Sequence, residues 1–360
     1  MHSSFCCSIF ILVKNLIIVI YNDDREIKRG SEEDIISLQS VIKTSEGVER
    51  ALIESNFKTL RIGLNSKNLI RTIEKIEESK PCLIFNLCEA FDGDPSLESN
   101  VAAIFELLNV VYTGSPPSAI GLTSNKEKTK QLLIQNNIPV PAGLSINTIQ
   151  NLESRGTREN GPWNLKFPLM VKPQSEDGSV GIDSNSVVFN FDTLKEKFEY
   201  IFNKYNQPVI VEEYIEGREF NVSILGNNPP HIFPVAEVDY SNTPPKAPKI
   251  LCYKSKWMKN SDSYRLTPSL CPANISVEIE NSIKEVALKT FEVTGCRDYA
   301  RVDIRLDNNN TPFVLEMNAN PDISIGDGMA KSAGVDGWSY NKLIKGIVST
   351  AIERFNENKN

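Results

Sequence analysis

Histidine is scarce in this sequence, and the cysteines form no paired motif. The 360 residues include only two histidines, His2 and His231. Zinc sites and Ser-His-Asp or Cys-His catalysis depend on histidine, so neither kind of site is expected. The seven cysteines form no CxxC motif and are odd in number. We therefore expect free thiols in a reducing compartment, which indicates a cytoplasmic protein.

The sequence also lacks a long hydrophobic run and an excess of positive charge. Residues 8–21 are apolar apart from Lys14 and Asn15, and this run is too short and too interrupted to span a bilayer. A signal peptide would place its charge first and end in small residues. We interpret residues 15–21 as a buried strand and residues 1–13 as an N-terminal extension, with a membrane anchor as the alternative. The net charge of −7 argues against nucleic acid or an anionic membrane as the main partner.

Strand and helix patterns alternate in residues 14–118, the first expected domain. Apolar β-branched or aromatic runs at residues 16–20 and 82–87 are typical of central parallel strands. Helical spacing covers residues 31–55, and an apolar helix is expected at residues 101–108, followed by a short strand at 110–113. This pattern predicts a small doubly wound α/β domain, a fold that binds ligands at the carboxyl ends of its strands. The segment SPPS at residues 115–118 ends the domain.

Two strands near the C-terminus carry the strongest chemical signal. Residues 299–306 (YARVDIRL) alternate strictly, which places Val302, Ile304 and Leu306 on one face. The opposite face then carries Arg301, Asp303 and Arg305. In residues 313–318 (FVLEMN), alternation groups Phe313, Leu315 and Met317 on one face and Glu316 with Asn318 on the other. If Leu306 pairs with Phe313, Asp303 lies directly across from Glu316.

Two facing carboxylates repel each other, and a hard cation removes the conflict. Oxygen ligands from Asp303, Glu316 and Asn318 suit Mg²⁺, with phosphate oxygens and water completing the shell. Arg301, on the same face, could contact a phosphoryl oxygen or a developing oxyanion. Taken alone, the pattern is equally typical of a solvated polar face with cross-strand arginine pairs.

Two further segments are weaker signals of a nucleotide site. In residues 167–181 (FPLMVKPQSEDGSVG), a buried strand ends at Lys172 and leads into a loop with Gly178 and Gly181. Such glycines let backbone N–H groups approach phosphates, although the Walker A pattern is absent. In residues 209–221 (VIVEEYIEGREFN), an apolar strand runs into several glutamates, where a purine edge and a ribose could bind. Each segment alone is more often an ordinary turn, and Lys126 and Lys256 would be surface lysines by default.

The motifs in their order resemble the ATP-grasp superfamily and, within it, the D-alanine–D-alanine ligase family. The matching pieces are ELLNVVYTGS, SNKEKTK, FPLMVKP…GSVG, VEEYIEGREF, YKSKW, GCRDYARVDIRLD and VLEMNANP, spread over residues 14–355. The resemblance implies a doubly wound (pre-ATP-grasp) domain at 14–118 and a two-lobed α+β ATP-grasp domain. The central lobe would cover residues 119–212 and the C-terminal lobe residues 213–360.

The resemblance also implies site residues and an activity. The residues implied to bind ATP are Lys126, Lys172, Gly178, Ser179, Gly181, Glu212, Glu213, Ile215 and Glu219. Asp303, Glu316 and Asn318 match the ligands of Mg²⁺ (or Mn²⁺), while Lys256 and Arg301 match catalytic groups. The implied enzyme is a ligase that joins a small-molecule carboxylate, activated as an acyl phosphate, to an amine. Amino acids are the implied substrates, peptidoglycan biosynthesis the implied setting, and a homodimer the implied assembly.

The substrate positions depart from the family pattern. The family's HG…GEDG loop reads CEAFDGDPS here and includes Glu89, and Gly178 stands where the ligases have a substrate-contacting serine. Glu32, Glu33 and Asp34 lie near the family's early substrate glutamate but out of register with it. Asp322 follows Asn318 where the family has a glycine, and an acid there could favour a cationic substrate.

We therefore expect a ligase of this type whose substrates differ from two D-alanines. The alternatives are another ATP-grasp ligase, acting on a different amino acid, a dipeptide or a hydroxy acid, an ATP-grasp kinase, and a non-catalytic nucleotide-binding protein.

Overall fold

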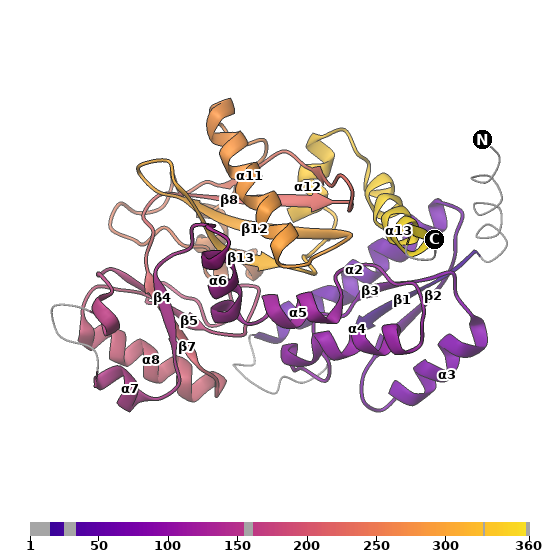
Figure 1. Cartoon of the computed structure of the whole chain (residues 1–360), viewed down its shortest axis with the longest axis horizontal. Coiled ribbons are helices and arrows are strands. Elements are labelled where there is room, and N and C mark those ends of the chain that lie inside the picture. Colours follow the sequence, from indigo (N-terminus) through magenta and orange to yellow (C-terminus); the bar gives the residue numbers. More distant parts are fainter. Residues whose placement is uncertain (1–14, 25–33, 155–160, 327, 358–360) are drawn as a thin grey trace.

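The computed structural model describes residues 15–24, 34–154, 161–326 and 328–357. The expected extension at residues 1–13 and the residues Glu32 and Glu33 lie outside this part. Three β-sheets, each with its own helices, lie side by side (Figure 1). Within the described residues, no helix combines the length and the apolarity that a membrane crossing requires.

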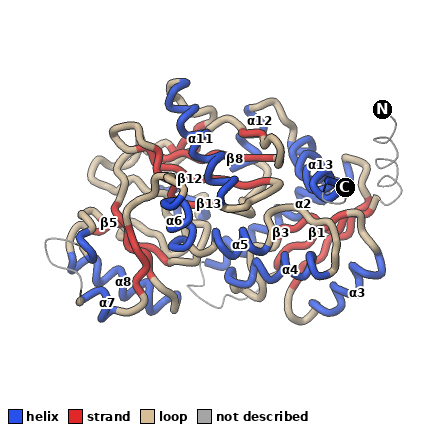
Figure 2. The backbone as a smooth tube through the Cα atoms, viewed as in Figure 1, coloured by secondary structure: helices blue, strands red, loops and turns tan. Residues whose placement is uncertain are grey.

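The first sheet is parallel, with strand order β2 (Lys58–Leu64), β1 (Leu16–Asn22) and β3 (Leu83–Leu87). Ile17 and Val19 of β1 pack in one core with α2 (Ile35–Glu54) and α13 (Tyr340–Glu357). Ile18 and Ile20 face the opposite core, with α3 (Leu69–Ser79) and α4 (Glu98–Leu107). Both faces are therefore covered, as Figure 2 also shows, which confirms the doubly wound fold and explains the continuous apolar run of β1.

The strand expected at residues 110–113 does not form, and this prediction was wrong. Only one isolated bridge, between Tyr112 and Ile84, joins this segment to β3. Asn109 (φ 49°) and Gly114 (φ 96°) both adopt left-handed conformations, and they bend the chain on either side of the bridge. The chain then enters α5 (Pro117–Thr123).

The second sheet is antiparallel, with order β4 (Gly143–Ile146), β7 (Val209–Glu213), β5 (Leu169–Pro173) and β6 (Val187–Val188). One face packs on α7 (Ile149–Glu153) and α8 (Phe191–Tyr205) through a core that includes Val171, Val211 and Phe198. Side chains alternate along a strand, so the intervening residues Lys172 and Glu212 point to the other face.

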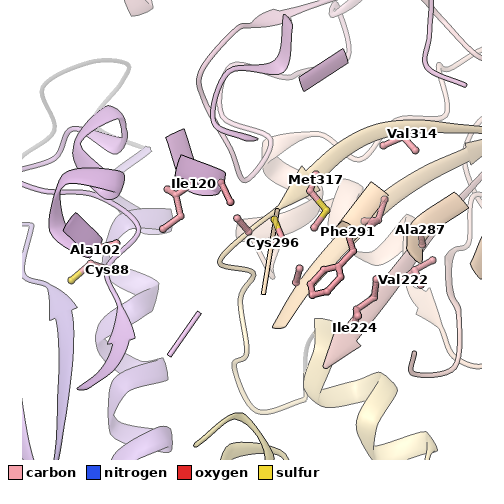
Figure 3. Packing of buried hydrophobic residues seen from close by; sticks show 14 of the residues in the cluster. Cys88, Ala102, Ile120, Val222, Ile224, Ala287, Phe291, Cys296, Val314 and Met317 are labelled. Atoms are coloured by element: carbon pink, nitrogen blue, oxygen red, sulfur yellow. The ribbon is translucent and has the colours of Figure 1, made fainter. Parts of the chain in front are cut away.

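The third sheet has the order β11 (Ser269–Leu270), β10 (Ala236–Val238), β8 (Arg218–Leu225), β12 (Tyr299–Leu306) and β13 (Pro312–Asn318), and β9 (His231–Ile232) pairs with β8. Helix α11 (Val277–Val293) covers its apolar face. Figure 3 shows Phe291 of this helix with Val222 and Ile224 of β8 and Met317 of β13, all members of one buried cluster.

The pairing of β12 with β13 corrects the expected register. Leu306 pairs with Pro312, not with Phe313, yet Asp303 still pairs with Glu316. A β-bulge reconciles the two facts, because Leu315 is an extra residue between the Ile304–Val314 and Asp303–Glu316 pairs. The bulge also places Val314, instead of Phe313 and Leu315, in the core with Met317, so the predicted faces of this strand were wrong at those positions.

The remaining helices are short. They are α6 (Lys126–Gln135), α9 (Tyr253–Trp257), α10 (Asp262–Leu266) and α12 (Gly328–Val335), with 3₁₀ turns at Pro95–Leu97 and Pro162–Asn164. Helix α6 begins where the side chain of Asn125 caps the backbone N–H of Lys128. The five cysteines within the described part are free thiols, as the sequence predicts for these five.

Candidate active site

A cavity of about 1330 Å³ lies between the polar faces of the second and third sheets. We call each sheet with the helices that pack on it a unit. Side chains of α2, in the unit of the first sheet, also line the cavity, including Gln39 and Lys43. All three units of the chain therefore contribute to one site. The predicted site residues that line the cavity are Lys126, Lys172, Gly178, Ser179, Glu212, Glu213, Ile215, Glu219, Lys256, Arg301, Asp303, Glu316 and Asp322.

Three predicted residues are not among those that line the cavity. Gly181 (φ 77°) packs so closely that a Cβ would lie 2.5 Å from the ring of Pro173. A larger residue would clash there, so glycine is needed at this position for packing. Asn318 pairs with Arg301 in the sheet, and its Nδ2 donates to Oδ2 of Asp303 at 3.2 Å. Glu89 lies within electrostatic range of Asp322, and burial together with this neighbour raises the pKa of Glu89 to about 8.

Arg301 and Asp303 form the centre of the polar face of β12. The guanidinium donates two hydrogen bonds to the carboxylate, Nε to Oδ1 at 2.7 Å and an Nη to Oδ2 at 2.8 Å. Asn221 of β8 also donates to Oδ1, at 2.8 Å. Burial alone would raise the pKa of Asp303, but Arg301, together with Lys256 and Asn221, holds this pKa below its ordinary value. Asp303 is therefore a carboxylate at neutral pH, on a face that is largely buried and lines the cavity.

Glu316 faces Asp303 from β13 and shows the opposite shift. Burial raises the pKa of Glu316, and the nearby charges of Asp177 and Asp303 act in the same direction, against Lys126. Two carboxylates on paired strands, with the amide of Asn318 beside them, form an oxygen-rich site for a hard cation. The donor set thus fits Mg²⁺ or Mn²⁺.

Lys126 begins helix α6 and reaches the same carboxylates. Its side chain is only 4% exposed, and its ammonium lies 3.7 Å from Glu316 and 3.0 Å from Asp177. It also donates to the backbone carbonyl of Glu176. Lys126 thus joins strand β13 to the glycine-bearing loop after β5.

A second buried lysine, Lys130, was missed in the sequence. It lies one helical turn after Lys126, and its ammonium contacts one oxygen of Glu212. Lys172 of β5 contacts the other oxygen of Glu212 at 2.7 Å. Glu212 is only 2% exposed, so two lysines from different elements contact one buried carboxylate. The spacing of Lys126 and Lys130 on one helix face was the available signal.

The glycine-bearing loop is anchored on α9. Gly178 (φ 63°) and Ser179 (φ 62°) both adopt left-handed conformations. The indole Nε1 of Trp257 donates to the carbonyl of Gly178 at 2.8 Å, and Oγ of Ser179 donates to the carbonyl of Leu251 at 2.8 Å. Beside Trp257, Lys256 lines the cavity, and burial together with Arg301 lowers the pKa of its ammonium. The loop and α9 therefore cover one side of the cavity as a unit.

An N-terminal doubly wound domain followed by two α+β lobes that enclose a polar cleft is the ATP-grasp fold. The chain belongs to the family described as D-ala D-ala ligase C-terminus, whose profile matches residues 132–349. It is 34% identical over 318 residues to the uncharacterized protein y4sG of Sinorhizobium fredii, covering 87% of this chain and 88% of that protein. It is 27% identical over 332 residues to the D-alanine–D-alanine ligase of Pelotomaculum thermopropionicum, covering 90% of this chain and 94% of that protein.

A solved structure shares the fold. The D-alanine–D-alanine ligase of Bacillus anthracis, crystallised in complex with ATP, superposes with a TM-score of 0.72 at 22% identity. The match covers 95% of this chain and 99% of that one. The similarity therefore extends over all three units of the chain.

Proposed function

We propose that this protein is an ATP-dependent ligase that activates a carboxylate as an acyl phosphate and joins it to an amine. The convergence of Lys126, Lys172, Lys256 and Arg301 on the Asp303–Glu316 pair, inside one cleft, is the observation that carries the proposal. Positive groups from two helices and two strands can hold a polyphosphate, and the paired carboxylates can hold its divalent cation. The relatives named as D-alanine–D-alanine ligases support the same reaction class.

Each part of ATP has a proposed partner in the cleft. Lys126, Lys172 and Lys256 would hold the phosphates, with the loop of Gly178 and Ser179 covering them. Glu212, Glu213 and Ile215 would line the adenine pocket, and Glu219 would accept the ribose hydroxyls. Asp303, Glu316 and Asn318 would hold Mg²⁺, which supplies charge neutralisation at the phosphoryl oxygens when bound.

The reaction requires the protein to position the substrates and to stabilise negative charge, and it needs no covalent intermediate with the protein. The substrate carboxylate attacks the γ-phosphorus, forming an acyl phosphate and ADP, and the amine then displaces phosphate from the acyl carbon. The lysines hold the polyphosphate in line for the first step. Arg301, which donates two hydrogen bonds to Asp303, would stabilise the oxyanion of the second step. A scarcity of histidine is no obstacle to this mechanism.

The substrates are proposed to be amino acids or related acids and amines, as expected for a peptide-bond-forming ligase. The carboxylates of Glu89 and Asp322 depart from the family pattern and support substrates other than two D-alanines. Oδ1 of Asp322 accepts hydrogen bonds from the backbone N–H and the hydroxyl of Ser324, at 2.8 Å and 2.5 Å. Asp322 lines the cleft, where its other oxygen would be available to a substrate. The lobe boundary at residue 212, the homodimer and the cytoplasmic location stay predictions.

An ADP-release assay over paired acids and amines tests the proposal, with Asp303→Asn as the loss-of-function variant. We expect ADP and phosphate in equal amounts with one class of pair, and a fall of about a hundredfold or more in Asp303→Asn, because the metal site and the Arg301 partner are lost together. Asp336→Asn, which changes an exposed partner of His231, should keep wild-type activity. A phosphorylated product without free phosphate would indicate a kinase, and ATP binding without ADP formation would indicate a non-catalytic protein.

A further inference from the structure

The carboxylate of Glu219 is held at one oxygen only. Glu219 lies on β8, lines the cavity and is 8% exposed. Its Oε2 accepts two hydrogen bonds, from an Nη of Arg305 at 2.7 Å and from the hydroxyl of Tyr240 at 2.8 Å. Among the described residues, none donates a hydrogen bond to Oε1. One oxygen is therefore fixed, and the other is open to a ligand in the cleft.

Arg305 is the rigid part of this arrangement. It lies directly across from Glu219 in the sheet and is 3% exposed. Its other Nη donates to the carbonyl of Ile215 at 3.1 Å, and the guanidinium also contacts the carbonyl of Lys249. The planar guanidinium lies 5.0 Å from the ring centre of Tyr214 and 5.8 Å from that of Tyr240. A planar fork held by two carbonyls and two rings leaves the carboxylate little freedom to turn.

An ionised carboxylate accepts hydrogen bonds and donates none, and each of its oxygens can accept two. When Oε2 is anchored, Oε1 points in one direction and can receive two hydroxyl donors from adjacent carbons. An unanchored glutamate would have to lose rotamer freedom to make the same contacts, which weakens binding. A vicinal diol is the ligand chemistry that matches a fixed, open carboxylate oxygen.

We propose that Arg305 and Tyr240 are positioning residues that fix Glu219 to receive both ribose hydroxyls, and that they set the preference of the site for ribonucleotides over deoxyribonucleotides. The proposal rests on the proposed function for the identity of the nucleotide. It adds residues that act on specificity through Glu219. The same guanidinium donates a hydrogen bond to the carbonyl of Ile215, a residue expected to line the adenine pocket.

The test compares dissociation constants for ATP, 2′-deoxy-ATP and 3′-deoxy-ATP, measured by calorimetry with Mg²⁺ and without an amino acid. The wild type should bind ATP more tightly than either deoxynucleotide. Arg305→Met should reduce this preference about tenfold, the usual effect of removing a hydrogen bond to a charged group. Tyr240→Phe should reduce it about threefold, and Glu219→Gln should abolish it.

Arg218→Met is the matched control. Arg218 is also a strand arginine bound to a carboxylate, Glu237, but its side chain is 43% exposed. This variant should keep the wild-type preference. If Arg305→Met fails to fold, Tyr240→Phe carries the test, because it removes one hydroxyl only.

Equal weakening of ATP and deoxy-ATP binding in Arg305→Met and Tyr240→Phe would overturn the proposal, because it would reveal a purely structural role. A wild type with no preference between the nucleotides would overturn it as well. Lost preference in the variants together with absent ADP release in the wild type would support the positioning role and contradict the ligase. A wild type that binds no ATP would contradict both.

Discussion

At the scale of single residues, three largely buried carboxylates of the site each form ion pairs with basic side chains. Asp303 is paired with Arg301, Glu219 with Arg305, and Glu212 with two lysines. A buried charge without a partner is costly, so each pair depends on both members. The partners come from different strands and helices, which makes the charge state of the cleft a property of the assembled fold.

Lys130 provides a test at this scale. Lys130→Met removes one of the two lysines that contact Glu212, so that Lys172 becomes the lysine partner of this carboxylate and is less available to a phosphate. We expect the dissociation constant for ATP to rise about tenfold, as for the loss of one charge-assisted hydrogen bond. Lys128→Met on the same helix, at an exposed position, should leave ATP binding unchanged. Unaltered ATP binding in Lys130→Met would show that Lys172 does not depend on this neighbour.

At the scale of elements, the loop after β5 brings a carboxylate into contact with a lysine that lines the cleft. The carboxylate of Asp177 lies 3.0 Å from the ammonium of Lys126, a group expected to contact phosphate. The side chain of Asp177 is 47% exposed, so the contact is partly solvated and of modest strength. A phosphate at Lys126 would compete with this carboxylate.

Removing the competing charge should favour the nucleotide. Asp177→Asn keeps the size of the side chain, and we expect it to lower KM for ATP by a factor of about two to five. The change should shrink at high salt, since a partly exposed pair is screened. Asp192→Asn, at the start of α8 and away from the cleft residues, is the control. A higher KM in Asp177→Asn would mean that this carboxylate assists binding instead.

The strands show which elements the sequence predicts and which it does not. Continuous apolar runs identified β1 and β3, and alternation identified the polar face of β12. The edge strand β2, with the mixed sequence KTLRIGL, is half-buried and carries no such run, so no strand was predicted there. The bulge at Leu315 is one extra residue, which alternation alone cannot reveal.

Contacts distant in the sequence were beyond prediction for a different reason. Lys130 and Glu212 lie 82 positions apart, and Arg305 and Glu219 lie 86 apart. Which polar groups meet across two sheets depends on how the sheets pack, and neither periodicity nor composition encodes that packing. The motif order, together with the alternation of the two C-terminal strands, instead predicted thirteen residues that line the cavity.

At the scale of the whole molecule, one buried carboxylate joins the first and third units. Asp298 is fully buried and accepts hydrogen bonds from the backbone N–H of Gly114, from Asn227 and from Arg354 of α13. An Nη of Arg354 also donates to the carbonyl of Tyr112 at 2.8 Å. The last helix is thereby fastened to the connection that leads out of the first sheet.

Breaking this junction should lower the stability of the whole chain. Arg354→Met leaves Asp298 buried without its cation, and we expect the free energy of unfolding to fall by about 3 kcal/mol. Lys195→Met removes an exposed pair with Glu153 and should change stability by less than about 1 kcal/mol. Thermal unfolding followed by calorimetry measures both. Equal, small effects would show that the junction is not a major source of stability.

The central claim, that a carboxylate oxygen is phosphorylated in this cleft before the amide forms, has one direct measurement. The acid of the most active acid–amine pair is labelled with ¹⁸O in its carboxylate, and the released phosphate is analysed by mass spectrometry. An acyl phosphate transfers one labelled oxygen to phosphate, so the account predicts one ¹⁸O in each phosphate formed. Phosphate without ¹⁸O, alongside amide formation, would contradict the account.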